Sequence, residues 1–378
     1  MDVAKFGVIG AGDAGNFHTL AFKGKTDAKV QYVAVCDIDE KTVNKFAKRL
    51  KIEPFTDIDT FLQQDLDAVL VAVPHFLHAE IVKRVAEAGK NVICEKPMAT
   101  TLEECDEMIS ATKKAGVKFM IAENHRFLPA HRKIKEMLDA GFLGDVYLGR
   151  TYEGAFVPMK HFLDANNWQF TYERGGGGVL ADQGVHKFAL LEYLLGDVES
   201  GEAWLSKVFN SPESKGEDNA MMNLHFKNGA MVNVIVSSTT VHPLNNDTEL
   251  HGTKGHILEN HSWEKPIKVF SNSPDAEKKG EYYEVACEHG AYPAYYLISA
   301  FHEDTHFAES IINDTDPEFT PEQAKEAVAT VLLGYLSAKN GRRTTMEELK
   351  SHAESQGTKD LLEGLQEVTQ QNYETVKW

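Results

Sequence analysis

The feature that most constrains the fold is an alternation of short apolar runs with amphipathic segments over the first 120 or so residues. The apolar runs are continuous, so both faces of each predicted strand must be buried. The segments between them have the charge spacing and the closing glycines of helices. The predicted strands are Lys5–Ile9, Val30–Cys36, Ala68–Val73, Asn91–Cys94 and Lys118–Ala122, and the predicted helices are Ala14–Lys23, Glu40–Leu50, His78–Ala88 and Leu102–Ala115. This pattern predicts an α/β fold with a doubly wound parallel sheet.

The pattern changes near residue 125, where a predicted helix over Ala130–Ala140 is followed by longer, alternating strands. The predicted strands are Val146–Gly154, Gly201–Phe209, Ala220–Phe226, Ala230–Ser237, Thr248–Gly252 and His256–Glu259, and further helices are expected at 182–195, Ala294–Ile312 and Pro321–Lys339. Asn228–Gly229 is a hairpin turn. We therefore predict a first domain over 1–124 and a second α/β domain over 125–378 with a large, open, mostly antiparallel sheet. The C-terminal helices can pack back on the first domain.

The charge composition excludes some classes of binding partner. The chain has 39 basic and 57 acidic residues and a formal net charge of −18, which disfavours nucleic acid and anionic lipid. No apolar run is long enough for a membrane span. The N-terminus has no basic leader and the four cysteines have no metal or disulfide spacing, so we expect a cytoplasmic protein. The predicted partners are a small molecule and a second copy of the chain, which would cover the open sheet.

A glycine-rich loop closes the first predicted strand and opens the first predicted helix. Gly10, Gly12 and Gly15 follow the spacing G-x-G-x-x-G, with Asp13 and Ala14 completing the loop. Gly10 permits a tight turn, and Gly12 lets a pyrophosphate group approach the backbone closely. Gly15 lets the helix pack close to the sheet. The helix N-terminus adds amide donors for phosphates. This context favours a dinucleotide site over a glycine turn without a ligand.

Asp37 ends the second predicted strand. A carboxylate at this position accepts hydrogen bonds from the adenosine ribose hydroxyls and repels a 2′-phosphate. The residues that follow, Ile38, Asp39 and Glu40, include no Arg or Lys. We therefore predict NAD rather than NADP as the cofactor. The alternative is that Asp37 only caps the next helix.

Lys96 is the first catalytic candidate. It lies in Glu95-Lys96-Pro97, directly after an apolar strand, and ligands of doubly wound sheets bind at the carboxyl ends of the strands. A lysine there can hydrogen-bond a substrate hydroxyl and lower its pKa. A solvated loop lysine is the alternative.

Asp182 and His186 are the second candidates. Their four-residue spacing places both on one side of a predicted helix, after a run of glycines at Gly175–Gly178 that lets the backbone pass close to another group. A carboxylate beside an imidazole orients the ring and stabilises its protonated form, which makes a better general base. The alternative is a capping aspartate with a surface histidine.

Together these motifs resemble the Gfo/Idh/MocA oxidoreductases, which include glucose–fructose oxidoreductase and inositol dehydrogenase. The residues that carry the resemblance are Gly10–Gly15, Asp37, Pro74-x-x-x-His78, Glu95-Lys96-Pro97, Asp182-x-x-x-His186 and Asn340-Gly341-Arg342. The likeness spans nearly the whole chain. It implies a Rossmann domain followed by an α/β domain with a large open sheet.

The resemblance also implies a site and an activity. Lys96, Asp182 and His186 are expected to surround the substrate beside the nicotinamide. The further cofactor-lining residues that it implies are Val73, Pro74, His75, His78, Glu95 and Asn124. We predict an NAD-dependent oxidation of a secondary hydroxyl of a sugar, glycoside or cyclic polyol, with C3 of a glucoside preferred and NAD held tightly. The alternatives are a redox-neutral NAD-dependent glycosidase and a non-catalytic sugar or dinucleotide sensor.

One motif points elsewhere. His302-Glu303-Asp304-Thr305-His306 reads H-E-x-x-H on a predicted helix, the spacing of a zinc protease. Zinc proteases carry no dinucleotide loop, and only Glu309 lies downstream as a third ligand. We interpret the match as chance, with a substrate-facing His302 or His306 as the alternative, and we predict no metal.

Overall fold

The computed structural model describes residues 2–26, 28–154, 167–208, 216–240, 246–261, 263–290 and 293–371. The chain divides into two compact units. Unit 1 comprises Met1–Ala99, Glu103–Phe127 and Tyr296–Lys325, and unit 2 comprises Thr100–Leu102, Leu128–Tyr295 and Glu326–Trp378. No helix among the described residues is long and apolar enough to cross a membrane.

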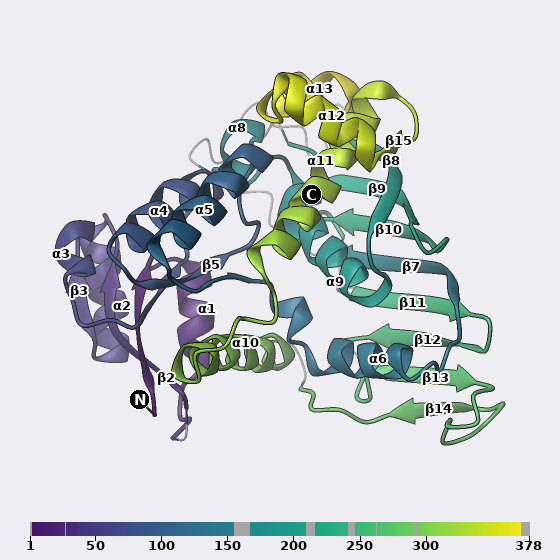
Figure 1. The fold of residues 1–378 in the computed structure, drawn as a ribbon, viewed down its shortest axis with the longest axis horizontal. Coiled ribbons are helices and arrows are strands. Elements are labelled where there is room, and N and C mark those ends of the chain that lie inside the picture. The colour runs from purple at the N-terminus through teal and green to yellow at the C-terminus, as the bar shows by residue number, and fades with distance from the viewer. Residues whose placement is uncertain are drawn as a thin grey trace. The chain divides into compact units, whose positions relative to one another are not determined.

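Unit 1 is built on a parallel sheet of six strands (Figure 1). The strands are β1 (Ala4–Ile9), β2 (Val30–Cys36), β3 (Glu53–Phe55), β4 (Ala68–Val71), β5 (Asn91–Glu95) and β6 (Phe119–Ala122), in the order β3-β2-β1-β4-β5-β6. This order confirms the predicted doubly wound sheet. The short edge strand β3 escapes prediction because it contains Pro54 and lacks an apolar run.

The helices of unit 1 include one from far along the chain. They are α1 (Asp13–Ala21), α2 (Glu40–Leu50), α3 (Ile58–Leu62), α4 (His78–Glu87), α5 (Leu102–Ala115) and α10 (Ala294–Ile312), with short turns η1 (His75–Leu77) and η2 (Asn124–Arg126). Figure 1 shows α10 beside α1. Aromatic contacts hold it there: Phe307 lies 6.1 Å from Phe6 and Phe301 lies 5.1 Å from Phe22 between ring centroids. Residues 296–325 are therefore part of unit 1.

Unit 2 is built on a large sheet that contains ten strands among the described residues. The strands are β7 (Val146–Gly154), β8 (Val198–Lys207), β9 (Asn219–Phe226), β10 (Met231–Ser237), β11 (Asn246–Gly252), β12 (Gly255–Asn260), β13 (Ile267–Ser271), β14 (Tyr282–Val285), β15 (Thr344–Thr345) and β16 (Gln370–Gln371). The order is β14-β13-β12-β11-β7-β10-β9-β8-β15, with β16 pairing β8. Only β7–β10 and β8–β16 pair parallel within this described sheet, which confirms the mostly antiparallel prediction. The strands β13 to β16 were not predicted, and Phe209, at the end of one predicted strand, lies outside the described residues.

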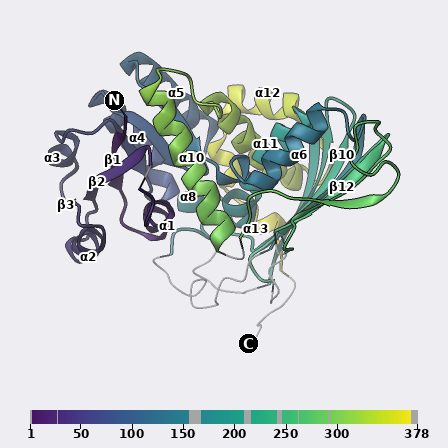
Figure 2. The same ribbon diagram turned by 90° about the horizontal axis from the view of Figure 1, so that it is seen from below.

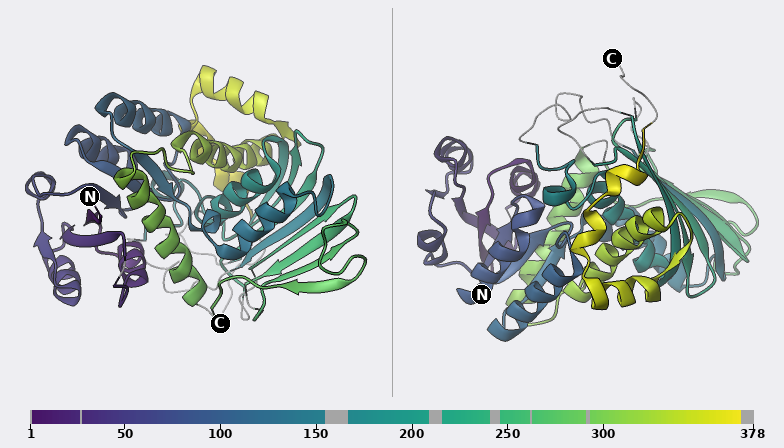
Figure 3. Two further views of the ribbon diagram at one scale, coloured as in Figure 1. Left: turned by 60° about the horizontal axis from the view of Figure 1, so that its bottom comes forward. Right: turned by 90° about the horizontal axis from the view of Figure 1, so that it is seen from above.

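Helices of unit 2 lie along one face of this sheet (Figures 2 and 3). They are α6 (Pro129–Asp139), α9 (Val185–Leu195) and α11 (Pro321–Asn340); α8 (Tyr172–Gly175), α12 (Met346–Gln356), α13 (Leu365–Val368) and the turns η3 (Leu180–Gly184) and η4 (Lys359–Leu362) complete the unit. Side chains along a strand therefore alternate between the covered face and the open face. On β9, Met222 and Leu224 are buried, whereas Met221 is exposed. The opposite face presents large apolar side chains to solvent: Tyr147, Leu148, Trp204, Met221, Met231 and Tyr282.

Candidate active site

The glycine-rich loop has the geometry that its spacing predicts. Gly10 has φ of 105°, and a Cβ there would lie 2.1 Å from the Ala72 carbonyl oxygen. A Cβ on Gly15 would lie 2.3 Å from the Gly10 carbonyl oxygen, so helix and strand can approach only through glycine. By contrast, a Cβ on Gly12 meets nothing within 4 Å. The exposed Gly12 and Asp13 therefore leave open space above the N-terminus of α1, where a pyrophosphate group fits.

Asp37 is tied to this loop rather than to the next helix. One carboxylate oxygen accepts from the Ala11 amide at 2.8 Å and the other from the Asp39 amide at 2.9 Å. The N-cap of α2 is Asp39, whose side chain accepts from the Thr42 amide at 2.6 Å. Asp37 therefore does not cap α2, and its half-buried carboxylate retains acceptor sites for ribose hydroxyls.

The loop after β4 contains four of the predicted cofactor residues. Val73 and Pro74 are half-buried, whereas His75 and His78 are buried and their rings lie 5.6 Å apart. The nitrogens of His78 lie 2.9 Å from the Pro97 carbonyl and 3.0 Å from the Val73 carbonyl. Burial lowers the pKa of His78, and a neutral ring donates to one of these carbonyls at a time. His78 has no exposed surface. Its contacts join the loop that follows β4 to the loop that follows β5.

Lys96 follows β5 at the carboxyl edge of the sheet, next to the loop that follows β4. Its side chain is half-buried, and its main-chain amide donates to the Glu95 carboxylate at 3.0 Å. The other Glu95 oxygen lies 3.1 Å from Nε2 of His18. The position of Lys96 is therefore set by a carboxylate that is itself held by the first helix.

His18 belongs to a buried network that the sequence did not reveal. Its Nδ1 lies 2.9 Å from the Asp304 carboxylate on α10, and the Tyr32 hydroxyl donates to the same carboxylate at 2.5 Å. Burial opposes a charge on His18, but Asp304 and Glu95 outweigh it and raise the pKa well above the ordinary value. A positive His18 between two carboxylates thus connects α10 to the strand end that carries Lys96.

Asn124 lies in η2, directly after β6, and is half-buried. Its side-chain amide donates to the Ser299 hydroxyl of α10 at 3.1 Å, and Ser299 donates to the Tyr296 carbonyl at 2.7 Å. The start of α10 therefore supports the strand-end residue that the resemblance places at the cofactor.

Asp182 and His186 lie in unit 2, at a helical irregularity. Asp182 is in the π-helical turn η3, and His186 is in the first turn of α9, which follows without a break. Both side chains are half-buried. π-Turns occur often at functional sites because they redirect side chains within a helix.

The glycine run before this turn is packed against buried groups. A Cβ on Gly177 would overlap the Tyr335 hydroxyl at 1.8 Å, and one on Gly178 would overlap the Glu217 carbonyl oxygen at 1.9 Å. The buried Glu217 carboxylate accepts from the amides of Gly178 and Leu180 at 3.1 and 3.0 Å, and from the Tyr335 hydroxyl at 2.9 Å. Burial raises the pKa of Glu217 to about 7. Glu217, which the sequence did not single out, therefore anchors the turn that carries Asp182.

The residue after His186 is also unusual. Lys187 is fully buried and its ammonium donates to the Asn246 side chain at 2.5 Å, while Glu153 lies 3.2 Å away. The Asn246 amide in turn donates to Glu153 at 2.6 Å. Buried charge needs such pairing, so this network fixes the first turn of α9 to β7 and β11.

The H-E-x-x-H segment does not form a zinc-protease site. Nε2 of His306 accepts from the Glu318 amide at 2.8 Å, and its ring packs 5.4 Å from Phe127. Between the two histidines, Glu303 and Asp304 are buried, and Asp304 holds His18. Burial raises the pKa of Glu303 well above its ordinary value, so its carboxyl group is a poor general base and a poor ligand. The motif is thus used for packing within unit 1.

Comparison with known proteins agrees with this geometry. The model of the oxidoreductase family with an NAD-binding Rossmann fold, GFO/IDH/MocA, matches residues 4–123, and the C-terminal domain model of the same family matches residues 131–258. The chain belongs to the Gfo/Idh/MocA family. It is therefore an oxidoreductase with an NAD-binding N-terminal domain, which confirms the predicted family, enzyme class and cofactor.

Relatives within the Gfo/Idh/MocA family act on several compounds. Levoglucosan dehydrogenase of Pseudarthrobacter phenanthrenivorans is 29% identical over 314 residues, 74% of this chain and 79% of that protein. Myo-inositol 2-dehydrogenase of Thermotoga maritima is 28% identical over 342 residues, 89% and 96% of the two chains. A 2,7-anhydro-N-acetylneuraminate hydratase of Mediterraneibacter gnavus is 25% identical over 377 residues, 92% and 98% of the two chains. A solved levoglucosan dehydrogenase in complex with NADH and levoglucosan shares the fold, with a TM-score of 0.81 and 24% identity over 91% of this chain and 99% of that one.

Proposed function

We propose that this Gfo/Idh/MocA protein is an NAD-dependent dehydrogenase that oxidises a secondary hydroxyl of a sugar, glycoside or cyclic polyol. The observation that carries the proposal is Lys96, a half-buried lysine at the carboxyl end of β5 whose main chain is held by Glu95 and, through it, by His18. A cation at the cofactor edge of the sheet suits the polarisation of a substrate hydroxyl. The relatives named for levoglucosan and inositol support the substrate class.

Each proposed catalytic side chain has one task. Lys96 donates a hydrogen bond to the hydroxyl oxygen and lowers its pKa. His186 takes the hydroxyl proton, and Asp182 stabilises the protonated imidazole that results. When bound, NAD supplies the two-electron acceptor for the alcohol carbon. In this scheme the chain binds and orients the substrate and moves one proton, with the dinucleotide bound by unit 1 and the proton accepted by His186 of unit 2.

We infer the cofactor position from the loop geometry. Gly12 and Asp13, with the α1 amides, would hold the pyrophosphate, and Asp37 would hold the adenosine ribose. Val73, Pro74 and Asn124 border the same edge, which fits the nicotinamide end of a dinucleotide. We propose that the dinucleotide remains bound during purification, and that C3 of a glucoside is the first position to test.

A redox-neutral reaction is the second candidate, because one relative is named a hydratase, and hydration changes no net oxidation state. The two functions differ in one observable. A dehydrogenase accumulates NADH in proportion to its product, whereas a redox-neutral enzyme converts substrate without net NADH.

A panel of glucosides, anhydrosugars, free sugars and inositols tests both functions. Each compound is incubated with the enzyme and NAD, NADH is followed by absorbance, and products are identified by mass spectrometry. We expect stoichiometric NADH and a product lighter by two hydrogens. Product formation without NADH supports the redox-neutral reaction, and binding without turnover across the panel supports a sensor. Mass analysis of small molecules released on denaturation tests whether NAD co-purifies.

A further inference from the structure

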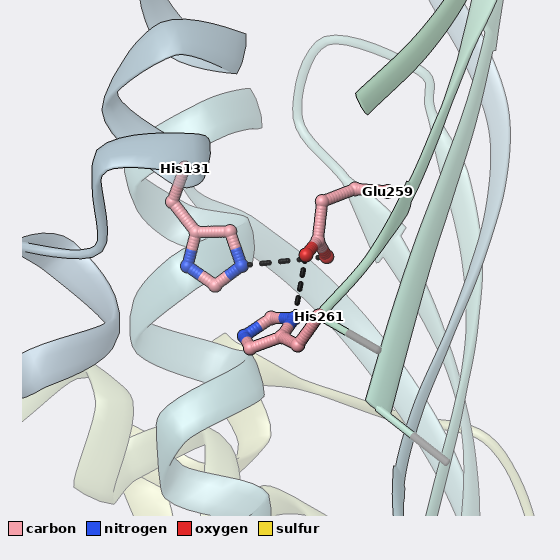
Figure 4. A group of neighbouring side chains, drawn as sticks. All are labelled: His131, Glu259 and His261. Atoms are coloured by element: carbon pink, nitrogen blue, oxygen red, sulfur yellow. Dashed lines mark ion pairs between the residues drawn. The ribbon is translucent and has the colours of Figure 1, made fainter. Parts of the chain in front are cut away.

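A cluster of two histidines and a glutamate lies inside unit 2, separate from the residues assigned above. His131 projects from α6, while Glu259 and His261 come from the end of β12 (Figure 4). All three side chains are at most 4% exposed. Glu259 lies in β12, and His261 follows directly after the end of that strand.

The potential ligand atoms converge. Nε2 of His131 lies 3.5 Å from one Glu259 oxygen, and Nδ1 of His261 lies 2.5 Å from the other. Figure 4 shows both imidazoles directed at the carboxylate. One ligand atom from each residue lies within 4.8 Å of the others. Ligands that share a Zn²⁺ at about 2.0–2.2 Å are separated by roughly 3–3.5 Å, so small shifts of these side chains, with Glu259 and His261 moving apart, place the atoms around one ion.

The donor set suits a cation, because a carboxylate and two imidazoles can each offer a lone pair to one ion. Aromatic rings enclose the cluster: Tyr295 lies 4.9 Å from His261, and His289 stacks on Tyr295.

We propose that His131, Glu259 and His261 form a zinc site that joins α6 to β12 in the core of unit 2. Two imidazoles and a carboxylate are a ligand set that Zn²⁺ takes readily, and they leave a fourth position for water. We predicted no metal from the sequence because His131 lies far along the chain from Glu259 and His261, and the three residues follow no spacing motif.

A second cluster in unit 1 does not meet the same criteria. His18, Glu303 and Asp304 also lie within reach of one another. However, both nitrogens of His18 already face carboxylates, and the raised pKa of His18 keeps its ring protonated. A protonated imidazole has no lone pair for a metal. The chemistry of the donors therefore selects the cluster in unit 2.

Zinc binding to the full chain tests the proposal. The protein is produced without a histidine tag, stripped with a chelator, and titrated with Zn²⁺ against a chromophoric chelator. We expect one tightly bound Zn²⁺ per chain and a melting temperature that rises with Zn²⁺ concentration. Glu259→Gln and His261→Gln should each weaken binding on the order of 10- to 100-fold or more, since even outer-shell losses have effects of this size. His256→Gln is the matched control, because His256 lies on the same strand but outside the cluster.

Two results would overturn the site. The first is stoichiometric Zn²⁺ binding that survives in the Glu259 and His261 variants. The second is wild-type protein that binds Zn²⁺ no more tightly than those variants do. Should the variants fail to fold, the visible absorption spectrum of wild-type protein loaded with Co²⁺ tests the site instead. Intense visible bands from Co²⁺ in a low-symmetry site support the three ligands, whereas the weak spectrum of hydrated Co²⁺ rejects them. Neither readout depends on dehydrogenase activity.

Discussion

At the scale of single residues, Lys96 and His186, the proposed catalytic side chains, each lie beside residues that are held by charge. Glu95 fixes the backbone of Lys96 and is itself held by His18. His186 lies one residue before Lys187, whose buried contacts with Asn246 and Glu153 hold the helix start in place. Lys96, His186 and Glu95 are half-buried, whereas His18 and Lys187 are buried.

His186→Ala should reduce kcat by roughly 10²- to 10⁴-fold, because it removes the general base. NAD binding should be unchanged, since the glycine loop lies in unit 1. Asp182→Asn should reduce kcat less than His186→Ala does. Steady-state kinetics and NAD titration measure these effects. Near-normal turnover in His186→Ala would transfer the proton-accepting role to Lys96.

Lys96→Met and Lys96→Arg should both be severely impaired, with kcat falling more than substrate affinity. Methionine removes the charge, and arginine replaces a compact ammonium by a bulky planar group that cannot lose its proton near neutral pH. A loss concentrated in kcat marks an interaction made mainly in the transition state. Activity of Lys96→Met within a few-fold of wild type would exclude Lys96 from the reaction.

Asp37→Ser combined with Ile38→Arg should shift preference from NAD toward NADP. The change removes the charge that opposes a 2′-phosphate and adds a partner for it, and Ile38 is 95% exposed, so arginine needs no repacking. NAD affinity should also fall, because Asp37 accepts from the Ala11 amide of the loop. Dissociation constants for both dinucleotides measure the shift, with Ile38→Arg alone as the control. Equal affinity of the wild type for NAD and NADP would contradict the role of Asp37.

At the scale of elements, the turn η3 depends on a carboxyl group from another part of unit 2. Glu217 joins the Gly178 amide, the Leu180 amide and the Tyr335 hydroxyl, so one side chain ties the glycine run and η3 to α11. Glycines at 177 and 178 are required there because any side chain would overlap Tyr335 or Glu217. The orientation of Asp182 is thus a property of this packing as much as of its own helix.

Glu217→Gln should flatten the pH dependence of stability. The pKa of Glu217 is raised from 4.5 to about 7 in the folded state, so between these values the folded chain holds a proton that the unfolded chain releases. The free energy of unfolding of the wild type therefore falls as pH rises through this window, by roughly 3 kcal/mol from this group. Denaturant unfolding at several pH values measures the slope. The exposed Glu199→Gln is the control, and an unchanged slope in Glu217→Gln would refute this role of burial.

At the scale of the whole molecule, one face of the large sheet carries apolar side chains in opposed pairs. Trp204 is directly opposite Met221 on neighbouring strands, and Met231 is opposite Leu148. All four are about half exposed. An apolar surface of this kind on a chain with a net charge of −18 is typical of an interface. We propose that a second copy of the chain covers it.

Trp204→Glu should therefore lower the oligomeric state measured by analytical ultracentrifugation. Around a two-fold axis the substitution places one new negative charge on each copy in an apolar contact, where it is desolvated. Ile38→Glu, a substitution of an exposed apolar residue in unit 1, should leave the state unchanged. A wild-type protein that is monomeric at micromolar concentration would contradict the proposal that a second copy covers this face.

The sequence by itself determined the doubly wound sheet, the glycine loop, the position of Asp37 at the end of the second strand and the place of Lys96 at a strand end. These features depend on local periodicity and on a general rule, that parallel strands bring their carboxyl ends to one edge. The strands β3, β13 and β14 were not predicted, because short, partly polar segments carry little periodic signal.

Only the tertiary structure decided which distant side chains meet. Asp304 reaches His18, Glu217 reaches the glycine run, and Glu259 meets His131, each across a separation that no spacing motif encodes. The physical reason is that a buried charge must find a partner wherever packing brings one, and packing is settled by the whole core rather than by neighbours along the chain.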